Sequence, residues 1–261
     1  MDRNQVRARI IEVAGAVKEK LIERGWSPPE QEQGLKKKRA GPARTDPFWS
    51  PDRGYKYIDD VEDHIGRFFQ CLDLLNPQGG SVLEIGPGNC YFLFMCRELC
   101  GCRPGGVEWI CDEASTRKKV KKMPFHDLKM YAYGLFREQF GLDGTIKHQI
   151  VQGFRPVDFG GIHSYIVATR AMFNHGWGPE EFRFWLRDCY EHLDPGGRLM
   201  VHFNKVTAGS LAAWPFLMPL HPLPGAEKLS IVSREEIGRA LQETESANSS
   251  GRRAAVRTPN G

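Results

Sequence analysis

The sequence lacks any long apolar run. Among its 261 residues, no stretch approaches the roughly 20 apolar residues that a helix needs to cross a bilayer. Its first five residues, Met1 to Gln5, also lack the apolar core of a signal peptide. Seven cysteines are an odd number for a disulfide framework, and reduced thiols suit a chain without an export signal. These absences predict a cytoplasmic protein with no membrane partner.

A CxxC pair is also missing. Cys96, Cys100, Cys102 and Cys111 fall within sixteen residues, but their spacing does not meet a zinc pattern. Buried apolar thiols are therefore the better interpretation, and no metal site is predicted.

Charge of one sign is not in large excess. The net charge of +4 permits an acidic partner without requiring one. Two basic runs, 36–39 and 117–122, leave a nucleic-acid contact open. A solvated basic loop is the simpler interpretation of the first run.

What the sequence does contain is a short apolar run that ends in a carboxylate and a glycine-rich turn. Residues 81–90 read SVLEIGPGNC, and a helical pattern follows from Tyr91 to about Leu99. A strand, a tight glycine turn and a helix N-terminus in this order are typical of a nucleotide-type site in an α/β fold.

Two common phosphate-binding patterns are absent from this turn. A dinucleotide fingerprint needs a third glycine where Tyr91 stands, and a P-loop needs Gly-Lys followed by Ser or Thr. What remains is E-x-G-x-G, which starts at Glu84, with Glu108 lying 24 residues further on at the end of the next expected strand. A carboxylate in that position can accept both hydrogen bonds of a ribose diol.

Apolar periodicity predicts helices that alternate with strands. Helical patterns cover 5–24, 56–75, 91–99, 127–140 and about fifteen residues from Pro179, and later strands are expected at 107–110, 145–151, 165–168 and 198–203. This alternation predicts an α/β fold with a doubly wound, mostly parallel, Rossmann-like sheet and helices on both faces. The ligand would then lie among the loops at 86–90, 108–113, 152–156 and 169–175, beyond the carboxyl ends of the strands.

The chain divides into three expected parts. Residues 1–55 form an N-terminal helix and a wrapping segment, and residues 56–243 form the main domain. Residues 244–261 are polar and rich in Ser, Arg and Gly, which predicts a disordered tail.

Four motifs, in the right order, resemble those of the class I S-adenosylmethionine-dependent methyltransferases. They are VLEIGPG at 82–88, GVE at 106–108, LDPGGRL at 193–199, and SREEIGRAL at 233–241. The last is similar to the helix that often precedes the final two strands of the family. The resemblance covers about residues 56–242 and implies S-adenosyl-L-methionine as the cofactor, but it implies no particular substrate.

The resemblance also implies roles for the matching residues. Gly86 and Gly88 would let the backbone pass close to the methionine part of the cofactor. Glu84 would orient this loop and reach the cofactor's amino group, with loop bracing alone as the alternative. Glu108 would hold the ribose hydroxyls. The other cofactor contacts are expected from the same loops, at Pro87, Trp109, Phe154 and Thr169.

The sequence departs from the family pattern at four places. Cys90 stands where a third glycine is frequent, and the acid often found just before the fourth strand is missing at 163–165. Phe154 follows Gly153 where an acid often meets the adenine amine, so ring packing is expected to hold adenine instead. After Leu241 no apolar pattern suggests two more strands, so the sheet is expected to lack its C-terminal edge strands.

Methyl transfer has no obligatory catalytic signature, because the enzyme needs only to hold the nucleophile and the methyl group in line. The loop after the fourth strand supplies the catalytic candidates: a base (His175), an amide (Asn174) and a cation (Arg170). His202, at the end of the fifth strand, is a second candidate base, with a packed histidine as the alternative.

The sequence therefore predicts an S-adenosylmethionine-dependent methyltransferase with an unidentified small-molecule acceptor. Two alternatives remain open. The acceptor could be a nucleic acid or protein that meets the basic runs, or the chain could be a non-catalytic cofactor-binding module, since fold does not dictate function.

Overall fold

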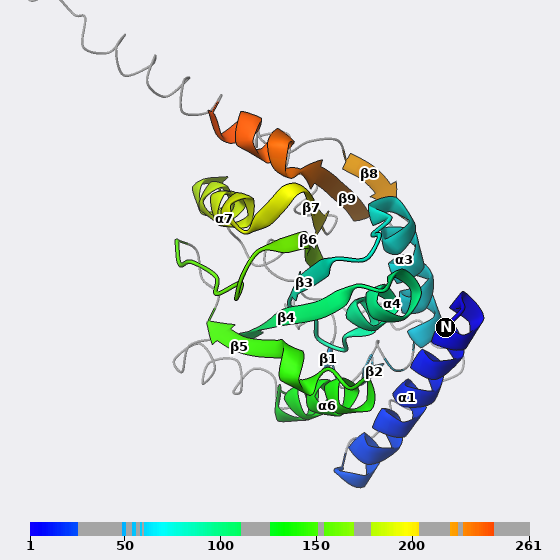
Figure 1. Ribbon diagram of the computed structural model, residues 1–261. Coiled ribbons are helices and arrows are strands. Elements are labelled where there is room, and N and C mark those ends of the chain that lie inside the picture. Colours follow the sequence, from blue (N-terminus) through cyan, green and yellow to red (C-terminus); the bar gives the residue numbers. More distant parts are fainter. Residues whose placement is uncertain are drawn as a thin grey trace, which may run out of the picture.

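A seven-stranded sheet forms the centre of the molecule, with the strand order β5-β4-β3-β6-β7-β9-β8 (Figure 1). The computed structural model describes residues 1–25, 49–50, 54–55, 58, 60–110, 126–150, 154–169, 179–203, 220–223 and 227–242. Its strands are β3 (Ser81–Ile85), β4 (Arg103–Ile110), β5 (Ile146–Ile150), β6 (His163–Thr169), β7 (Leu193–Phe203), β8 (Leu220–Leu223) and β9 (Glu227–Ser233). The first five of these strands are parallel, and β9 is antiparallel to both β7 and β8.

Helices cover both faces of this sheet (Figure 1). One face carries α1 (Arg3–Glu23), α3 (Val61–Leu75), α4 (Tyr91–Cys100) and α6 (His126–Gln139), whose buried side chains share one core cluster. The other face carries α7 (Pro179–Glu191) and a helix at 234–242, which share a second cluster. A separate pair of short strands, β1 (Trp49–Ser50) and β2 (Gly54–Tyr55), is antiparallel. The predicted doubly wound, mostly parallel α/β fold is confirmed.

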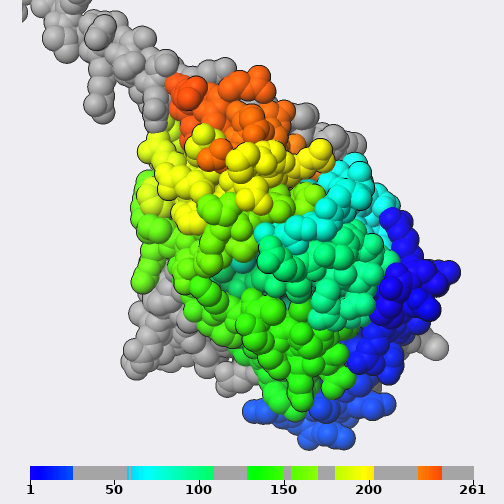
Figure 2. Space-filling model, viewed as in Figure 1, coloured from blue at the N-terminus to red at the C-terminus, as the bar shows by residue number. Residues whose placement is uncertain are grey.

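The N-terminal helix α1 belongs to the first core cluster. Asp2 and Gln5 form a capping box at its start. The side chains at the predicted helical spacing, Val6, Ile10, Val13, Val17 and Leu21, are all buried, and so is Ala14. Arg3 pairs with Asp73 at the end of α3, so α1 begins near the end of α3. Figure 2 shows α1 lying along the surface beside the segments that contain α3, α4 and α6.

The expectation that the sheet lacks its C-terminal edge strands is wrong. Strands β8 and β9 complete the sheet beyond β7. They precede the helix at 234–242, whereas the resemblance had matched residues 233–241 to a helix that comes before the last two strands of the family. In β9 the alternation is short, with Leu229 and Ile231 on one face and Ser230 and Val232 on the other, so its periodicity was missed.

Strand β8 was overlooked for a different reason. The sequence around it is too proline-rich for a helix and showed no strand pattern, but β8 is the edge strand and pairs on one side only. Pro222 lies within it, opposite Lys228 of β9. An edge strand tolerates proline because no second neighbour requires its missing N–H.

Two strands begin earlier than predicted. β4 begins at Arg103 rather than at Val107, and it includes Gly105 and Gly106. β7 begins at Leu193, and residues 194–197 form an irregularity between its pairings with His163 and Tyr165. The two glycines of the LDPGGRL motif therefore lie inside the strand, in a bulge.

None of the described helices combines the length and apolar character that crossing a membrane requires. The wrapping segment at 26–48, both basic runs and residues 243–261 lie outside the described residues, so the predictions made for them stay predictions.

Candidate functional site

Four buried polar residues line one face of the sheet at the carboxyl ends of its parallel strands. Glu84 pairs with Gly106 and with Val167 across the neighbouring strands. Because side chains alternate along a strand, Glu108 and Thr169 lie on the same face as Glu84. Thr169 pairs in turn with His202. We call Glu108, Glu84, Thr169 and His202 the polar row; all four are buried on the face that α3 and α4 cover.

Glu84 is the most deeply buried member of the polar row, with 1% of its surface exposed. Its Oε1 accepts a hydrogen bond from the Thr169 hydroxyl. Its Oε2 is also buried and has no hydrogen-bond partner among the described residues. Burial raises the pKa of the carboxyl to about 8, the Thr169 bond opposes this, and the charge of Glu108 adds to it. A buried carboxyl with one oxygen unsatisfied is suited to a cationic ligand group.

Glu108 holds the glycine turn. Its Oε2 accepts a hydrogen bond from the backbone N–H of Gly88 at 3.0 Å. The Gly86 N–H donates to the Val107 carbonyl at 2.8 Å, so the turn stays joined to β4 beyond the end of β3. The two carboxylates predicted to flank the turn therefore do so, with Glu108 bonded to its backbone.

Packing explains why the turn requires small residues. A Cβ placed on Gly88, which has φ +52°, would lie 3.2 Å from Cζ of Tyr133 on α6. A Cβ on Gly106 would lie 3.1 Å from Cγ of Pro87. Pro87 can therefore fold against β4 only because a glycine lies beneath it. Cys90, the residue at the predicted third glycine position, adopts φ 61° and is fully buried.

Asn89 was not among the residues predicted from the sequence. It lies in the turn just before α4 and is 3% exposed, and its Nδ2 has no hydrogen-bond partner among the described residues. The N-cap residue of α4, Cys90, gives no side-chain cap bond. An amide donor and an uncapped helix N-terminus together favour an acceptor or anionic ligand group. The only sequence signal for Asn89 was its place within the turn.

After β5 the described chain resumes at Phe154. Phe154 has φ 58° and is 61% exposed, and its ring lies edge-on to Phe184 of α7 at 5.9 Å. A large residue with positive φ is uncommon, and such strain is concentrated at functional sites. An exposed aromatic ring at this loop is consistent with the predicted contact to adenine.

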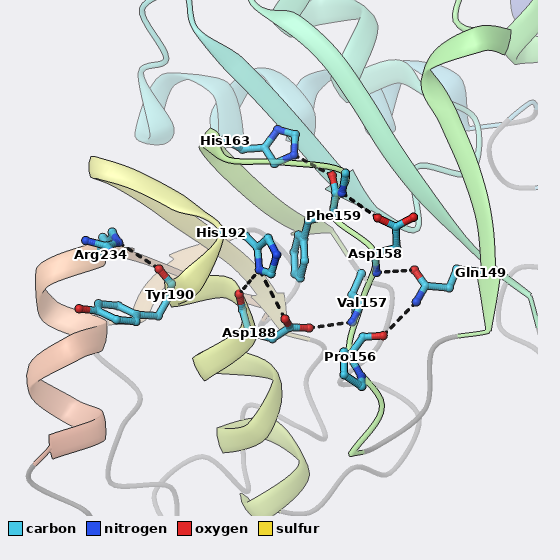
Figure 3. A network of polar contacts seen from close by, with 11 residues as sticks. Gln149, Pro156, Val157, Asp158, Phe159, His163, Asp188, Tyr190, His192 and Arg234 are labelled. Carbon is cyan, nitrogen blue, oxygen red and sulfur yellow. Dashed lines mark hydrogen bonds and ion pairs between the residues drawn. The ribbon is translucent and has the colours of Figure 1, made fainter.

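Residues 154–162, which we call the strap, run from this loop to β6 without a helix (Figure 3). The Gln149 side chain donates to the Pro156 carbonyl at 3.0 Å and accepts from the Asp158 N–H at 2.8 Å. The Val157 N–H donates to Asp188 Oδ2 of α7 at 2.7 Å, and burial raises the pKa of this carboxyl. His192 stacks on Phe159 at 4.5 Å. These contacts attach the strap to β5 and α7.

The remaining predicted site residues lie outside the described part of the chain. This applies to the three catalytic candidates, Arg170, Asn174 and His175, and to the side chain of Trp109. Among the described residues, no cluster of His, Cys, Asp or Glu could hold a metal ion. Cys96 and Cys102 are buried free thiols, as interpreted from the sequence, and Cys100 is half-buried.

No protein-family model and no curated protein matches the chain. Solved structures similar to it include an RNA methyltransferase from Salinibacter ruber in complex with S-adenosyl-L-homocysteine. It is 15% identical, with 64% of this chain and 88% of that chain covered and a TM-score of 0.38. A methyltransferase from Pyrococcus furiosus is 15% identical over 66% of this chain and 81% of that chain, with a TM-score of 0.40.

A third similar structure is the amino pentose methyltransferase CalS10 from Micromonospora echinaspora with bound SAM. It is 17% identical over 55% of this chain and 49% of that chain, with a TM-score of 0.34. Similarity at this level carries no argument about activity. The fold and the site by themselves define a Rossmann-like α/β protein with two carboxylates at a glycine turn.

Proposed function

We propose that this chain is an S-adenosylmethionine-dependent methyltransferase that acts on a small-molecule acceptor. The observation that carries the proposal is Glu84, a fully buried carboxyl of raised pKa whose Oε2 lacks a partner among the described residues. It stands beside the Glu108-bonded glycine turn, where a nucleotide-type ligand is expected in this fold.

The residues of the site match the chemical parts of this cofactor. Glu84 would bind the ammonium group, and Asn89 Nδ2 would donate to the carboxylate. Glu108 would accept from the ribose hydroxyls while it holds Gly88, since a carboxylate has several acceptor sites. Phe154 would pack on adenine. When bound, the cofactor supplies an electrophilic methyl group on a positively charged sulfur, and the residues of the chain orient the reactants and exclude water.

The pKa of Glu84 makes the proposal testable without an acceptor. At pH 7 a carboxyl with a pKa of about 8 is mostly protonated. An ammonium group beside it favours the carboxylate, so binding at pH 7 should release close to one proton. We expect titration calorimetry of S-adenosyl-L-homocysteine, repeated in buffers of different ionisation enthalpy, to detect this release. The affinity should rise with pH up to about 8 and level off above it.

Two controls test whether the released proton comes from Glu84. Glu84→Gln should bind the ligand more weakly and release no proton. 5′-Methylthioadenosine, which lacks the amino-acid part, should bind the wild type without proton release. Failure of S-adenosyl-L-homocysteine to bind at millimolar concentration would reject the proposed function. Binding with no proton release would reject the assignment of Glu84 to the ammonium group.

A small-molecule acceptor is supported by the mild net charge of +4, because polyanion binding usually rests on a strong basic excess. Affinity for RNA or DNA that falls steeply with salt would instead support the nucleic-acid alternative.

A further inference from the structure

His202 lies at the end of the polar row that is away from Glu108. It pairs with Thr169 across two parallel strands, and Thr169 donates a hydrogen bond to Glu84. Neighbouring strands lie about 4.8 Å apart and residues about 3.3 Å apart along a strand. His202 is two strands across from Glu84 and two residues further along, which places it about 12 Å away. It is buried, with 5% of its surface exposed. With the ribose at Glu108 and the amino group at Glu84, the row continues past the cofactor to His202.

His64, on α3, is a second buried histidine. The Arg198 Nη1 at the start of β7 donates to the Leu75 carbonyl at the end of α3, at 3.3 Å. α3 connects to the amino end of β3 through residues 76–80 and also contacts β9, so it runs antiparallel to β7 over this part of the sheet. The hydrogen bond between Arg198 and Leu75 therefore gives a common point from which positions along α3 and along β7 can be compared.

The distance from Leu75 to His64 along α3 is similar to the distance from Arg198 to His202 along β7. His64 is eleven residues before Leu75, which is about 16 Å along a helix and close to three full turns, so both residues face the sheet. His202 is four residues beyond Arg198, which is about 13 Å along a strand. His64 is 4% exposed. The first turn of α3 thus brings His64 to the carboxyl edge where His202 lies.

We infer that His202 is the general base of the site and that His64 lines the same acceptor-facing space. The inference rests on the proposed function and assigns the acceptor a hydroxyl or N–H group. As the oxygen or nitrogen of the acceptor forms its bond to the methyl carbon, the carbon–sulfur bond breaks and leaves its electron pair on sulfur. The proton of the acceptor passes to the His202 imidazole.

Few charged groups face this position from the described elements. Glu84 and Glu108 share the face of the sheet with His202, and His64 comes from α3. Glu62 and Asp63, in the first turn of α3, are exposed to solvent. On β9 the residue opposite His202 is the apolar Leu229. A change of charge on the sulfur should therefore be a major influence on His202 when the two ligand complexes are compared.

The test compares the NMR signals of the histidine ring protons, at one pH, in two complexes of the full chain. One complex contains S-adenosyl-L-methionine, whose sulfur is positively charged, and the other contains S-adenosyl-L-homocysteine, whose sulfur is neutral. A positive charge within about 10 Å changes the electric field at the imidazole, so the ring-proton signals of His202 should lie at different chemical shifts in the two complexes at pH 7. The His64 signals should move as well. His192, on the opposite face of the sheet, should not move.

The variants His202→Gln and His64→Gln assign the signals, with His202→Asn in reserve if the first does not fold. Both should still bind S-adenosyl-L-homocysteine with a Kd within about threefold of the wild type, because neither residue is assigned to the cofactor. Identical His202 ring signals in two well-formed complexes would overturn this inference and leave the cofactor site standing. A shift at His64 or His175 without one at His202 would overturn it as well. If neither ligand binds, the proposed function fails first, and the inference fails with it.

Discussion

Gly88 is the residue on which the geometry of the turn depends most directly. It has a positive φ, its N–H is bonded to Glu108, and the Tyr133 ring lies over its α-carbon. We expect Gly88→Ala to lower the free energy of unfolding by about 1–3 kcal/mol, because the added methyl group meets both backbone strain and the ring. Urea denaturation followed by circular dichroism measures the change.

Gly134 provides a matched control for this substitution. It lies in α6, one residue after Tyr133, and the nearest atom to a Cβ there is an Arg137 nitrogen at 3.9 Å. Gly134→Ala should be neutral or stabilise the protein by up to about 1 kcal/mol, because alanine favours a helix. A similar loss at both positions would show that Tyr133 does not constrain Gly88.

The spacing of residues predicted the two carboxylates of the site but not the environment that gives them their properties. Glu84 and Glu108 end neighbouring parallel strands, so their proximity follows from topology. The hydrogen bond from Thr169 and the position of Tyr133 depend on how β6 and α6 pack in three dimensions. The pKa of Glu84 depends on burial from all sides, which no local pattern contains.

The strap is the element whose stability rests most on side chains. It lacks a helix, and the buried carboxylate of Asp188 accepts the Val157 N–H. We expect Asp188→Ala to lower the free energy of unfolding by about 1–3 kcal/mol, because it leaves a buried N–H without its acceptor. Asp188→Asn keeps an oxygen acceptor and should cost less. Equal losses in the two variants, measured by urea denaturation at pH 7, would contradict this account.

Elements with strong periodicity were predicted well, and short edge strands were not. The helical spacing over 5–24 and the alternation of strands with helices both led to the observed elements. β8 and β9 are short, and β8 contains a proline. They are strands because β7 offers an unpaired edge next to them. That condition exists only once the rest of the sheet has formed.

At the scale of the whole molecule, α1 shares one core with the sheet. Ile10 is fully buried in that core, whereas the adjacent Ile11 is 37% exposed. We expect Ile10→Ala to lower the global free energy of unfolding by about 2–4 kcal/mol and Ile11→Ala to change it by less than about 0.5 kcal/mol. The chain should still unfold in a single transition by both fluorescence and circular dichroism.

An early, separate loss of helical signal in Ile10→Ala would instead show that α1 unfolds independently of the sheet. That outcome would also mean that the ion pairs between α1 and α3, Arg3–Asp73 and Arg7–Glu62, do not make the two helices unfold together.

The two outer strands of the sheet also bear on how copies of this chain behave toward one another. An uncovered strand edge offers a row of N–H and C=O groups to any other chain and can start aggregation. In β8, Pro222 removes one donor from that row. At the opposite margin, the Gln149 side chain of β5 bonds to the strap backbone, and Lys147 carries a charge there. In the described part of the chain, the outer strands β8 and β5 thus both carry features that discourage intermolecular strand pairing.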